Sequence, residues 1–148
     1  MQIGSKGDEM GWGVYEACRE NGGLIQTGHE HSYQRTKTLV DLSRQVIDPT
    51  CSSPTELCVG PGRTFVTVSG LGGSSVRPQR LCLPATPPYG CNGEWASISS
   101  LNQGGIYGAQ FITFNAGGAK KAVGYFKNIR GEVLDNFTIT YGAAPRRN

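Results

Sequence analysis

The sequence predicts an α/β fold of the α+β kind, in which antiparallel strands predominate beside a single helix. Three observations lead to this expectation. Residues 8–21 show helical periodicity and lead into a short apolar strand at 24–27. The last third of the chain shows the alternation of apolar and polar residues that is typical of strands. Between these parts lies a segment rich in glycine and proline, in which cysteines bracket two loops.

The first predicted element is a helix from Asp8 to Asn21. Asp8 is expected to cap its amino end, because a carboxylate can accept hydrogen bonds from the unpaired amides of the first turn. The pair Gly22-Gly23 is expected to end it. Three side chains at intervals of four are expected to form its apolar face, with Tyr15 beside them: Met10, Val14 and Cys18.

The remaining elements follow from alternation and turn residues. Strands are predicted at 24–27, at 36–40 and at 64–69, with loops at 48–62 and 70–105. The last three strands are predicted to form an antiparallel meander, at 106–115, 121–128 and 132–140. We therefore expect one partial domain over residues 1–148. Its three parts are a helix, strand and histidine motif at 1–47, a loop-rich segment at 48–105 and the meander at 106–141.

The five cysteines point to an oxidising compartment. Cys51 and Cys58 bracket a short polar loop, and Cys82 and Cys91 bracket one rich in proline. Short polar loops closed by two cysteines are typical of local disulfides, which persist in secreted proteins. Free or metal-binding cysteines are the alternative, although the spacing fits no common zinc motif. Cys18 is left over and is expected to be a buried thiol.

Composition narrows the possible partners. The net charge is only +3 and the basic residues are scattered, so the sequence lacks the basic stripe of a nucleic-acid-binding protein. No apolar run approaches the roughly 20 residues that span a membrane. Asn136-Phe137-Thr138 is a possible glycosylation site. No export signal opens the chain, so the disulfides predict that further residues precede Met1.

The two histidines of the chain lie together in Gly28-His29-Glu30-His31. Gly28 would let the backbone turn sharply at the end of the preceding strand. Neutral imidazole is a common metal ligand, and residues two apart in an extended chain point to the same side. The motif could therefore hold one ion or two neighbouring ions. A polar turn with two solvated histidines is the alternative interpretation of these residues.

The surrounding residues resemble a known family. The stretch from Gly28 through Ser32-Tyr33-Gln34-Arg35 to Thr36 resembles the last metal-binding motif of calcineurin-like phosphoesterases. That motif reads Gly-His-x-His and continues into Tyr-x-Arg in purple acid phosphatases, many of which have Glu where this chain has Gln34. Three further stretches are similar to the family in the same order: Gly7-Asp8-Glu9 with Gly11-Trp12, Val68 to Gly73, and Gly131 to Ile139.

The resemblance covers most of the chain and implies the carboxyl-terminal portion of a four-layer metallophosphoesterase β-sandwich. It implies a secreted phosphoesterase that hydrolyses phosphate mono- or diesters with two metal ions (Zn, Fe or Mn). His29 would bind one ion and His31 the other, and the two ions would activate the attacking water. Glu30 is expected to face solvent or to lie behind the ligands. Tyr33 and Arg35 are expected to fix the loop by packing rather than to act in catalysis.

The family's other motifs are absent from these residues. Asp-x-His, Gly-Asp and Gly-Asn-His, which supply the bridging aspartate and further ligands, do not occur in a matching context. We therefore assign no catalytic residue and expect the isolated chain to be inactive, with the missing amino-terminal half of the domain as its partner. Two alternatives remain: a non-catalytic secreted β-rich module that reuses the fold, and a carbohydrate-binding β-sandwich that uses Trp12 and Trp95.

Overall fold

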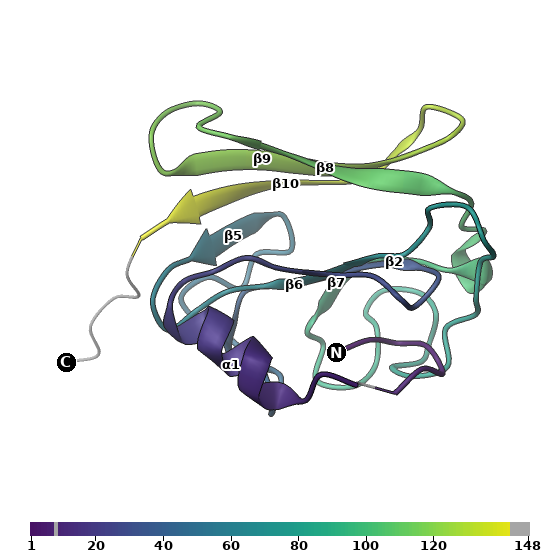
Figure 1. Ribbon diagram of the computed structural model, residues 1–148, viewed down its shortest axis with the longest axis horizontal. Coiled ribbons are helices and arrows are strands. Elements are labelled where there is room, and N and C mark those ends of the chain that lie inside the picture. Colours follow the sequence, from purple (N-terminus) through teal and green to yellow (C-terminus); the bar gives the residue numbers. More distant parts are fainter. Residues whose placement is uncertain (8, 143–148) are drawn as a thin grey trace.

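The computed structural model describes residues 1–7 and 9–142. Two four-stranded sheets lie face to face, and helix α1 (Trp12–Glu20) covers the outer face of the first sheet (Figure 1). The first sheet has the order β1-β6-β2-β7, formed by Ile25–Thr27, Val66–Ser69, Tyr33–Thr36 and Trp95–Ser99. The second sheet has the order β5-β10-β9-β8, formed by Glu56–Val59, Val133–Tyr141, Lys121–Asn128 and Gly108–Phe114. A two-stranded ribbon of β3 (Leu39–Asp41) and β4 (Val46–Ile47) and a 3₁₀ turn at Leu101–Gln103 complete the described elements.

Both sheets are mixed. β1 runs parallel to β6, and β5 runs parallel to β10, whereas the other neighbours are antiparallel. The predicted mixed fold with mainly antiparallel strands and one helix is therefore confirmed for the described residues. The meander is also confirmed, because β8, β9 and β10 pair in sequence and β9 has the predicted bounds. Both predicted disulfides, Cys51–Cys58 and Cys82–Cys91, are present.

The apolar side chains form two layers. One lies between the sheets and consists of a larger cluster, mainly from β5, β9 and β10, and a smaller one around Tyr33 of β2: Leu57, Val59, Phe65, Ala122, Phe137 and Ile139, then Tyr33, Leu71 and Phe126. The other lies between the first sheet and α1, with the amino-terminal segment and the proline-rich loop beside it: Met1, Ile3, Tyr15, Ile25, Leu39, Leu42, Val66, Tyr89, Trp95 and Ile98. The first sheet is thus covered on both faces, which explains why β2 is buried at every residue.

A buried ion pair joins the two sheets. Arg35 of β2 donates to both carboxylate oxygens of Asp135 on β10, from Nε at 2.6 Å and from Nη2 at 2.8 Å. Tyr33 donates its hydroxyl hydrogen to the same carboxylate at 2.7 Å. The guanidinium also lies 4.5 Å from the ring centre of Phe137. Because Arg35 is 1% and Asp135 8% exposed, the pair is largely shielded from water.

The helix is shorter than predicted and packs through different side chains. It begins at Trp12 because Gly11 takes a positive φ of 70°, which a right-handed helix cannot continue. Tyr15 is its buried residue, whereas Val14 is 46% exposed and Met10, before the helix, 62% exposed. The predicted apolar face is therefore wrong for Met10 and Val14, whereas Tyr15 and Cys18 do pack against the core, together with the partly buried Trp12. Cys18, which was expected to be buried, is only partly so. The predicted cap Asp8 lies outside the described residues.

The helix ends as predicted. The amide of Gly22 donates to Arg19 and the amide of Gly23 donates to Cys18, which is the hydrogen-bond pattern of a Schellman motif. Gly22 has a φ of 68°, and a Cβ there would lie 2.7 Å from the backbone carbon of Gly60. No helix in the described part of the chain is long and apolar enough to cross a lipid bilayer.

Three strands and one strand boundary were not predicted from the sequence, and one of the three strands is β4 at Val46–Ile47. β5 lies inside the predicted loop 48–62, and β7 lies inside the predicted loop 70–105. β7 lacks simple alternation because its register with β2 shifts next to Ala96, so Trp95 and Ile98 both reach the layer under α1. The strand predicted at 36–40 is divided into β2, which ends at Thr36, and β3, which begins at Leu39.

The ion pair between the sheets generates a stability prediction. We expect Arg35→Ala to lower the free energy of unfolding by about 3–5 kcal/mol, because it leaves the Asp135 carboxylate buried without its counter-charge. The control is Arg44→Ala, which removes the exposed partner of Asp41 at 3.9 Å and should change stability by less than about 0.5 kcal/mol. Urea unfolding followed by circular dichroism measures both. Equal stabilities of the two variants would contradict the role given to Arg35.

Candidate metal centre

The histidine motif lies at the edge of the first sheet where two parallel strands end. β1 ends at Thr27, whose register partner is Val68 of β6, so the segments after both strands emerge at the same edge. Gly28 to His31 follow β1, and the glycine-rich segment from Gly70 follows β6. Segments that leave the carboxyl ends of neighbouring parallel strands commonly form binding sites in mixed and parallel sheets. The topology thus gives the motif a position suited to function.

The two segments touch closely at Gly70. Its amide donates to the carbonyl oxygen of Ser32 at 3.0 Å. A Cβ at Gly70 would lie 1.9 Å from the carbonyl oxygen of Glu30, so no other residue fits without displacing the motif. Gly70 belongs to the stretch that resembles the family's glycine-rich strand end. A glycine is required at this position because the backbone of Glu30 approaches it closely.

The motif is a pair of tight turns rather than an extended chain. The amide of Glu30 donates to Gly28 at 2.9 Å, and the amide of Ser32 donates to Glu30 at 2.8 Å. His29 sits at the centre of the first turn with a φ of 71°, a conformation that non-glycine residues rarely adopt and that tends to occur at functional sites. The expectation that His29 and His31 point to the same side of an extended strand is therefore wrong.

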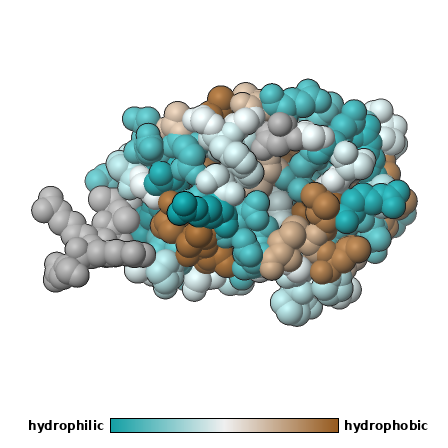
Figure 2. Space-filling view, turned by 90° about the horizontal axis from the view of Figure 1, so that it is seen from below, coloured by the Kyte–Doolittle hydropathy of each residue, from teal (hydrophilic) through white to brown (hydrophobic). Residues whose placement is uncertain are grey.

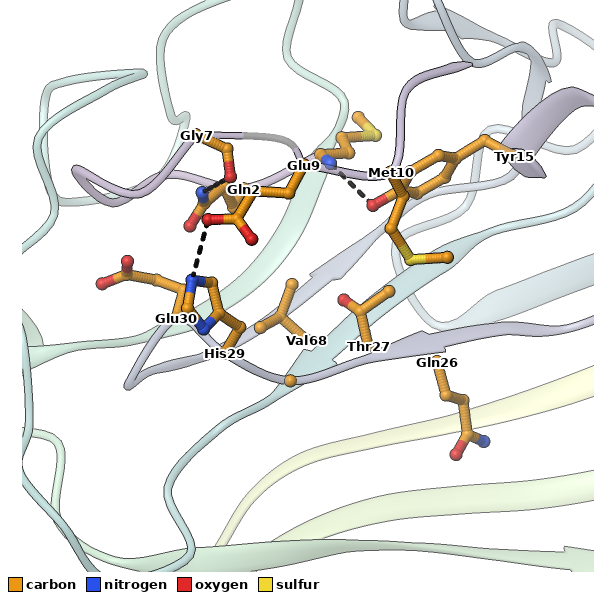
Figure 3. A pocket seen from close by; sticks show the side chains of 12 residues that line it. Gln2, Gly7, Glu9, Met10, Tyr15, Gln26, Thr27, His29, Glu30 and Val68 are labelled. Atoms are coloured by element: carbon orange, nitrogen blue, oxygen red, sulfur yellow. Dashed lines mark hydrogen bonds and ion pairs between the residues drawn. The ribbon is translucent and has the colours of Figure 1, made fainter. Parts of the chain in front are cut away.

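His29 lines a cavity of about 270 Å³ under the first sheet (Figure 3). The amino-terminal segment and the start of α1 close its other side, through Gln2, Glu9 and Tyr15 among others. The Nε2 of His29 lies 3.6 Å from the Oε1 of Glu9, and the two side chains are 54% and 75% exposed. An imidazole and a carboxylate thus meet at an open cavity.

His31 belongs to a different environment. It is not among the residues that line the cavity around His29. Its Nδ1 lies 2.6 Å from the hydroxyl oxygen of Ser75, in the segment that follows β6. The backbone of the same segment contacts the motif, because the amide of Arg77 donates to the carbonyl oxygen of His31 at 2.9 Å. Ser75 and Arg77 were not singled out from the sequence, since an exposed serine in a glycine-rich loop carries no signal of its own.

Glu30 is buried, with 1% of its surface exposed, so it does not face solvent. Its Oε2 lies 3.6 Å from Nη1 of Arg77, and neither carboxylate oxygen has a hydrogen-bond partner among the described residues. A Cβ at Gly4 would lie 2.0 Å from the carboxyl carbon of Glu30. The carboxylate therefore lies between the amino-terminal segment and Arg77, and Glu30 lines the cavity beside His29.

The side chains that follow the motif lead into the core. Burial and the neighbouring Asp135 carboxylate raise the pKa of Tyr33 well above its usual value, so Tyr33 stays protonated and donates to Asp135. Arg35 is held by Asp135 and by the carbonyl oxygen of Pro54. Gln34 accepts a hydrogen bond from the amide of Ile3 and donates one to the hydroxyl oxygen of Ser32. Tyr33 and Arg35 thus point between the two sheets, whereas Gln34 points to the other face of the first sheet, toward the amino-terminal segment, and none of the three lines the cavity.

The donors suit the ions that the resemblance implies, because imidazole and carboxylate bind Zn, Fe and Mn. Within residues 1–7 and 9–142, however, neither His29 nor His31 belongs to a group of three or more His, Cys, Asp or Glu residues whose ligand atoms lie within 4.8 Å of one another. Two other carboxylates are used elsewhere, since Asp41 bonds Ser43 and the backbone of Arg44, and Asp48 bonds Thr50 and Arg63. The described residues therefore bring two potential ligands, His29 and Glu9, together and do not form a complete two-metal site.

One cluster of three potential metal ligands has its ligand atoms close enough together to contact a single ion. Ligand atoms of Cys82, Cys91 and Glu94 lie within 4.8 Å of one another. The two sulfur atoms are bonded to each other as a disulfide. Metal ions bind the thiolate form of cysteine, so this cluster is not a metal site while the disulfide is intact. Burial raises the pKa of the Glu94 carboxyl, which accepts a hydrogen bond from the amide of Asn92.

Figure 2 shows the face that carries α1, on which hydrophobic side chains gather in separate patches among hydrophilic ones.

Comparisons of the chain with protein-family models, with curated proteins and with solved structures find no match. Assignment of a function therefore depends on the motif and its geometry.

The close approach at Gly70 generates a prediction. We expect Gly70→Ala to displace the histidine motif and to lower the free energy of unfolding by at least about 1 kcal/mol, because the added methyl group overlaps the Glu30 carbonyl oxygen. Gly72→Ala is the matched control, since a Cβ at Gly72 meets no atom within 4 Å. Amide chemical shifts of residues 28–32 and thermal unfolding report the two effects. If Gly70→Ala leaves both unchanged, the approach is looser than described.

Proposed function

We propose that this chain is the carboxyl-terminal segment of a secreted, two-metal phosphoesterase that hydrolyses phosphate mono- or diesters. The observation that carries the proposal is the position of the Gly-His-x-His motif. It lies where two parallel strands end, with His29 in a rare backbone conformation beside a cavity and a carboxylate. A conformation of this kind costs free energy and tends to persist where a function requires it.

The residues of this chain would bind and position the metal ions. His29, with Glu9 beside it, would contribute to one ion, and His31 would contribute to the other. Bound ions would supply the stabilisation of phosphoryl oxygens and the activation of water. Buried Glu30 and the ion pair of Arg35 would hold the motif in place. The remaining ligands, including a bridging aspartate, would come from the amino-terminal half of the domain, in the four-layer sandwich that the resemblance implies.

The two disulfides support a secreted location, because local disulfides persist in oxidising compartments. A secreted protein would also make Asn136 available for glycosylation, and the structure places this residue exposed on the second sheet, where it pairs in register with Tyr125. The motifs and the disulfides thus point to one class of protein, an extracellular hydrolase.

A non-catalytic secreted binding module is the second candidate. Phe111 and Tyr125 stack on the second sheet with ring centres 5.1 Å apart, and Phe111 is 47% exposed. Exposed aromatic pairs favour a binding surface over a purely structural role. This module would not need its histidines, so metal binding separates the two candidates.

We predict that the isolated chain binds Zn²⁺ weakly and shows no appreciable phosphoesterase turnover. If each ligand contributes equally to a four-ligand zinc site, two ligands of one ion, such as His29 with Glu9, give a dissociation constant of roughly 0.1 mM to 1 µM. His29→Ala and His31→Ala should each weaken binding. Asn115→Ala is the matched control, because Asn115 is also exposed with a positive φ of 59°. Isothermal titration and hydrolysis of an aryl phosphate and a diester give the two readouts.

The outcomes separate the parts of the proposal. Equal zinc affinities of the wild type and both histidine variants would contradict a metal-binding role for the motif. Metal-dependent turnover that His29→Ala abolishes would contradict the need for ligands from outside residues 1–148. A reading frame upstream of codon 1 that encodes Asp-x-His and Gly-Asn-His would support the enzyme over the binding module.

A further inference from the structure

We propose that Ser75 is a positioning residue for His31: its hydroxyl oxygen accepts a hydrogen bond from Nδ1–H and thereby leaves Nε2 free to bind a metal ion. This inference rests on the proposed metal-binding role of the motif and names the group that prepares one ligand. The Nδ1–Oγ distance of 2.6 Å places the two atoms in hydrogen-bond contact. Ser75 lies 44 residues after His31 in the sequence, so only the fold brings them together.

The chemistry of imidazole explains why such a partner matters. In a neutral histidine one of the two ring nitrogens carries a hydrogen atom, and only the other nitrogen has a lone pair for a metal ion. Ligating histidines commonly donate the ring hydrogen to an oxygen atom, which fixes both the tautomer and the direction of the ring. Without that partner, His31 would divide its population between two tautomers and several ring orientations, and metal binding would have to select one of them.

The contact is supported by the backbone on both sides. The amide of Gly70 donates to Ser32, and the amide of Arg77 donates to His31, so the segment 70–77 runs beside the motif at two fixed points. Arg77 adds the ion pair to buried Glu30 at 3.6 Å. Ser75 lies between these points. The path of the backbone after β6 therefore places the Ser75 hydroxyl group next to His31.

Ser74, the residue before Ser75, does not contact His31 through its side chain and therefore provides a control. Ser74 is also exposed, and its backbone carbonyl oxygen, not its side chain, accepts a hydrogen bond from the Tyr107 hydroxyl at 3.4 Å. Ser74→Ala is thus a control with the same chemical change one residue away. Ser75→Thr is a second control, because threonine keeps the hydroxyl group.

The first test is the tautomer of His31 in the metal-free chain. Long-range ¹H–¹⁵N spectra distinguish protonated from unprotonated ring nitrogens and therefore report the tautomer of each histidine. With two histidines in the chain, His31→Gln assigns the signals. We expect the wild type, Ser74→Ala and Ser75→Thr to show protonated Nδ1 on His31, and Ser75→Ala to show a shift toward the mixed population of a free imidazole. A His31 spectrum that Ser75→Ala leaves unchanged would overturn the proposal.

The second test is zinc affinity of the same chains, measured by competition with a chromophoric chelator. We expect Ser75→Ala to weaken binding about tenfold, the lower end of the effect seen when a partner of a metal ligand is removed. Ser74→Ala and Ser75→Thr should bind as the wild type does. Wild-type affinity in Ser75→Ala, together with weaker binding by His31→Ala, would overturn this inference alone. Equal affinities in the wild type and His31→Ala would overturn the proposed function as well.

Discussion

The structure depends on the buried contact between Arg35 and Asp135. This contact joins β2, in the middle of the first sheet, to β10, in the second sheet, across 100 residues of sequence. Burying two charges costs free energy, so the pair is tolerable only because every strong donor finds an acceptor: the guanidinium bonds both Asp135 oxygens and Pro54, and Tyr33 adds a third donor to the carboxylate. A slip of either strand by one residue would leave a charge unpaired in the core. The pair therefore sets how the two sheets face each other.

The contact between Arg35 and Asp135 also helps to fix the geometry of the candidate site. Tyr33 follows His31 by two residues, so fixing Tyr33 and Arg35 in the core fixes the end of the histidine turns. Gly70 holds the other side of the turns, and the Glu30 side chain lies against Gly4. With both ends held, His29 is kept at a positive φ of 71° that it would not adopt alone. Rigid neighbours on a strand give the motif a defined shape even though the histidine side chains reach the surface.

Local sequence signals predicted the elements whose cause is local. The bounds of β9 follow from its alternation, the end of α1 from Gly22-Gly23, and the two disulfides from short polar loops. Signals failed where a distant partner decides the structure. β7 is a strand because β2 offers it an edge, and the bulge opposite Arg35 and Thr36 hides its alternation. The packing face of α1 was misjudged because the core it covers is built from the amino-terminal segment and Tyr89, which periodicity within the helix does not reveal.

By itself, the sequence determined the residue types of the candidate metal centre and its place after a strand, because a glycine-flanked His-x-His motif is a local pattern. It also determined that the motif continues into Tyr33 and Arg35. Only the tertiary structure decided where the side chains go. The two tight turns send His29 to Glu9 and His31 to Ser75, and the burial of Glu30 depends on Gly4 and Arg77. The physical reason is that ring orientation and burial depend on residues far along the chain, such as Ser75, 44 residues after His31, which become neighbours only when β1 and β6 pair.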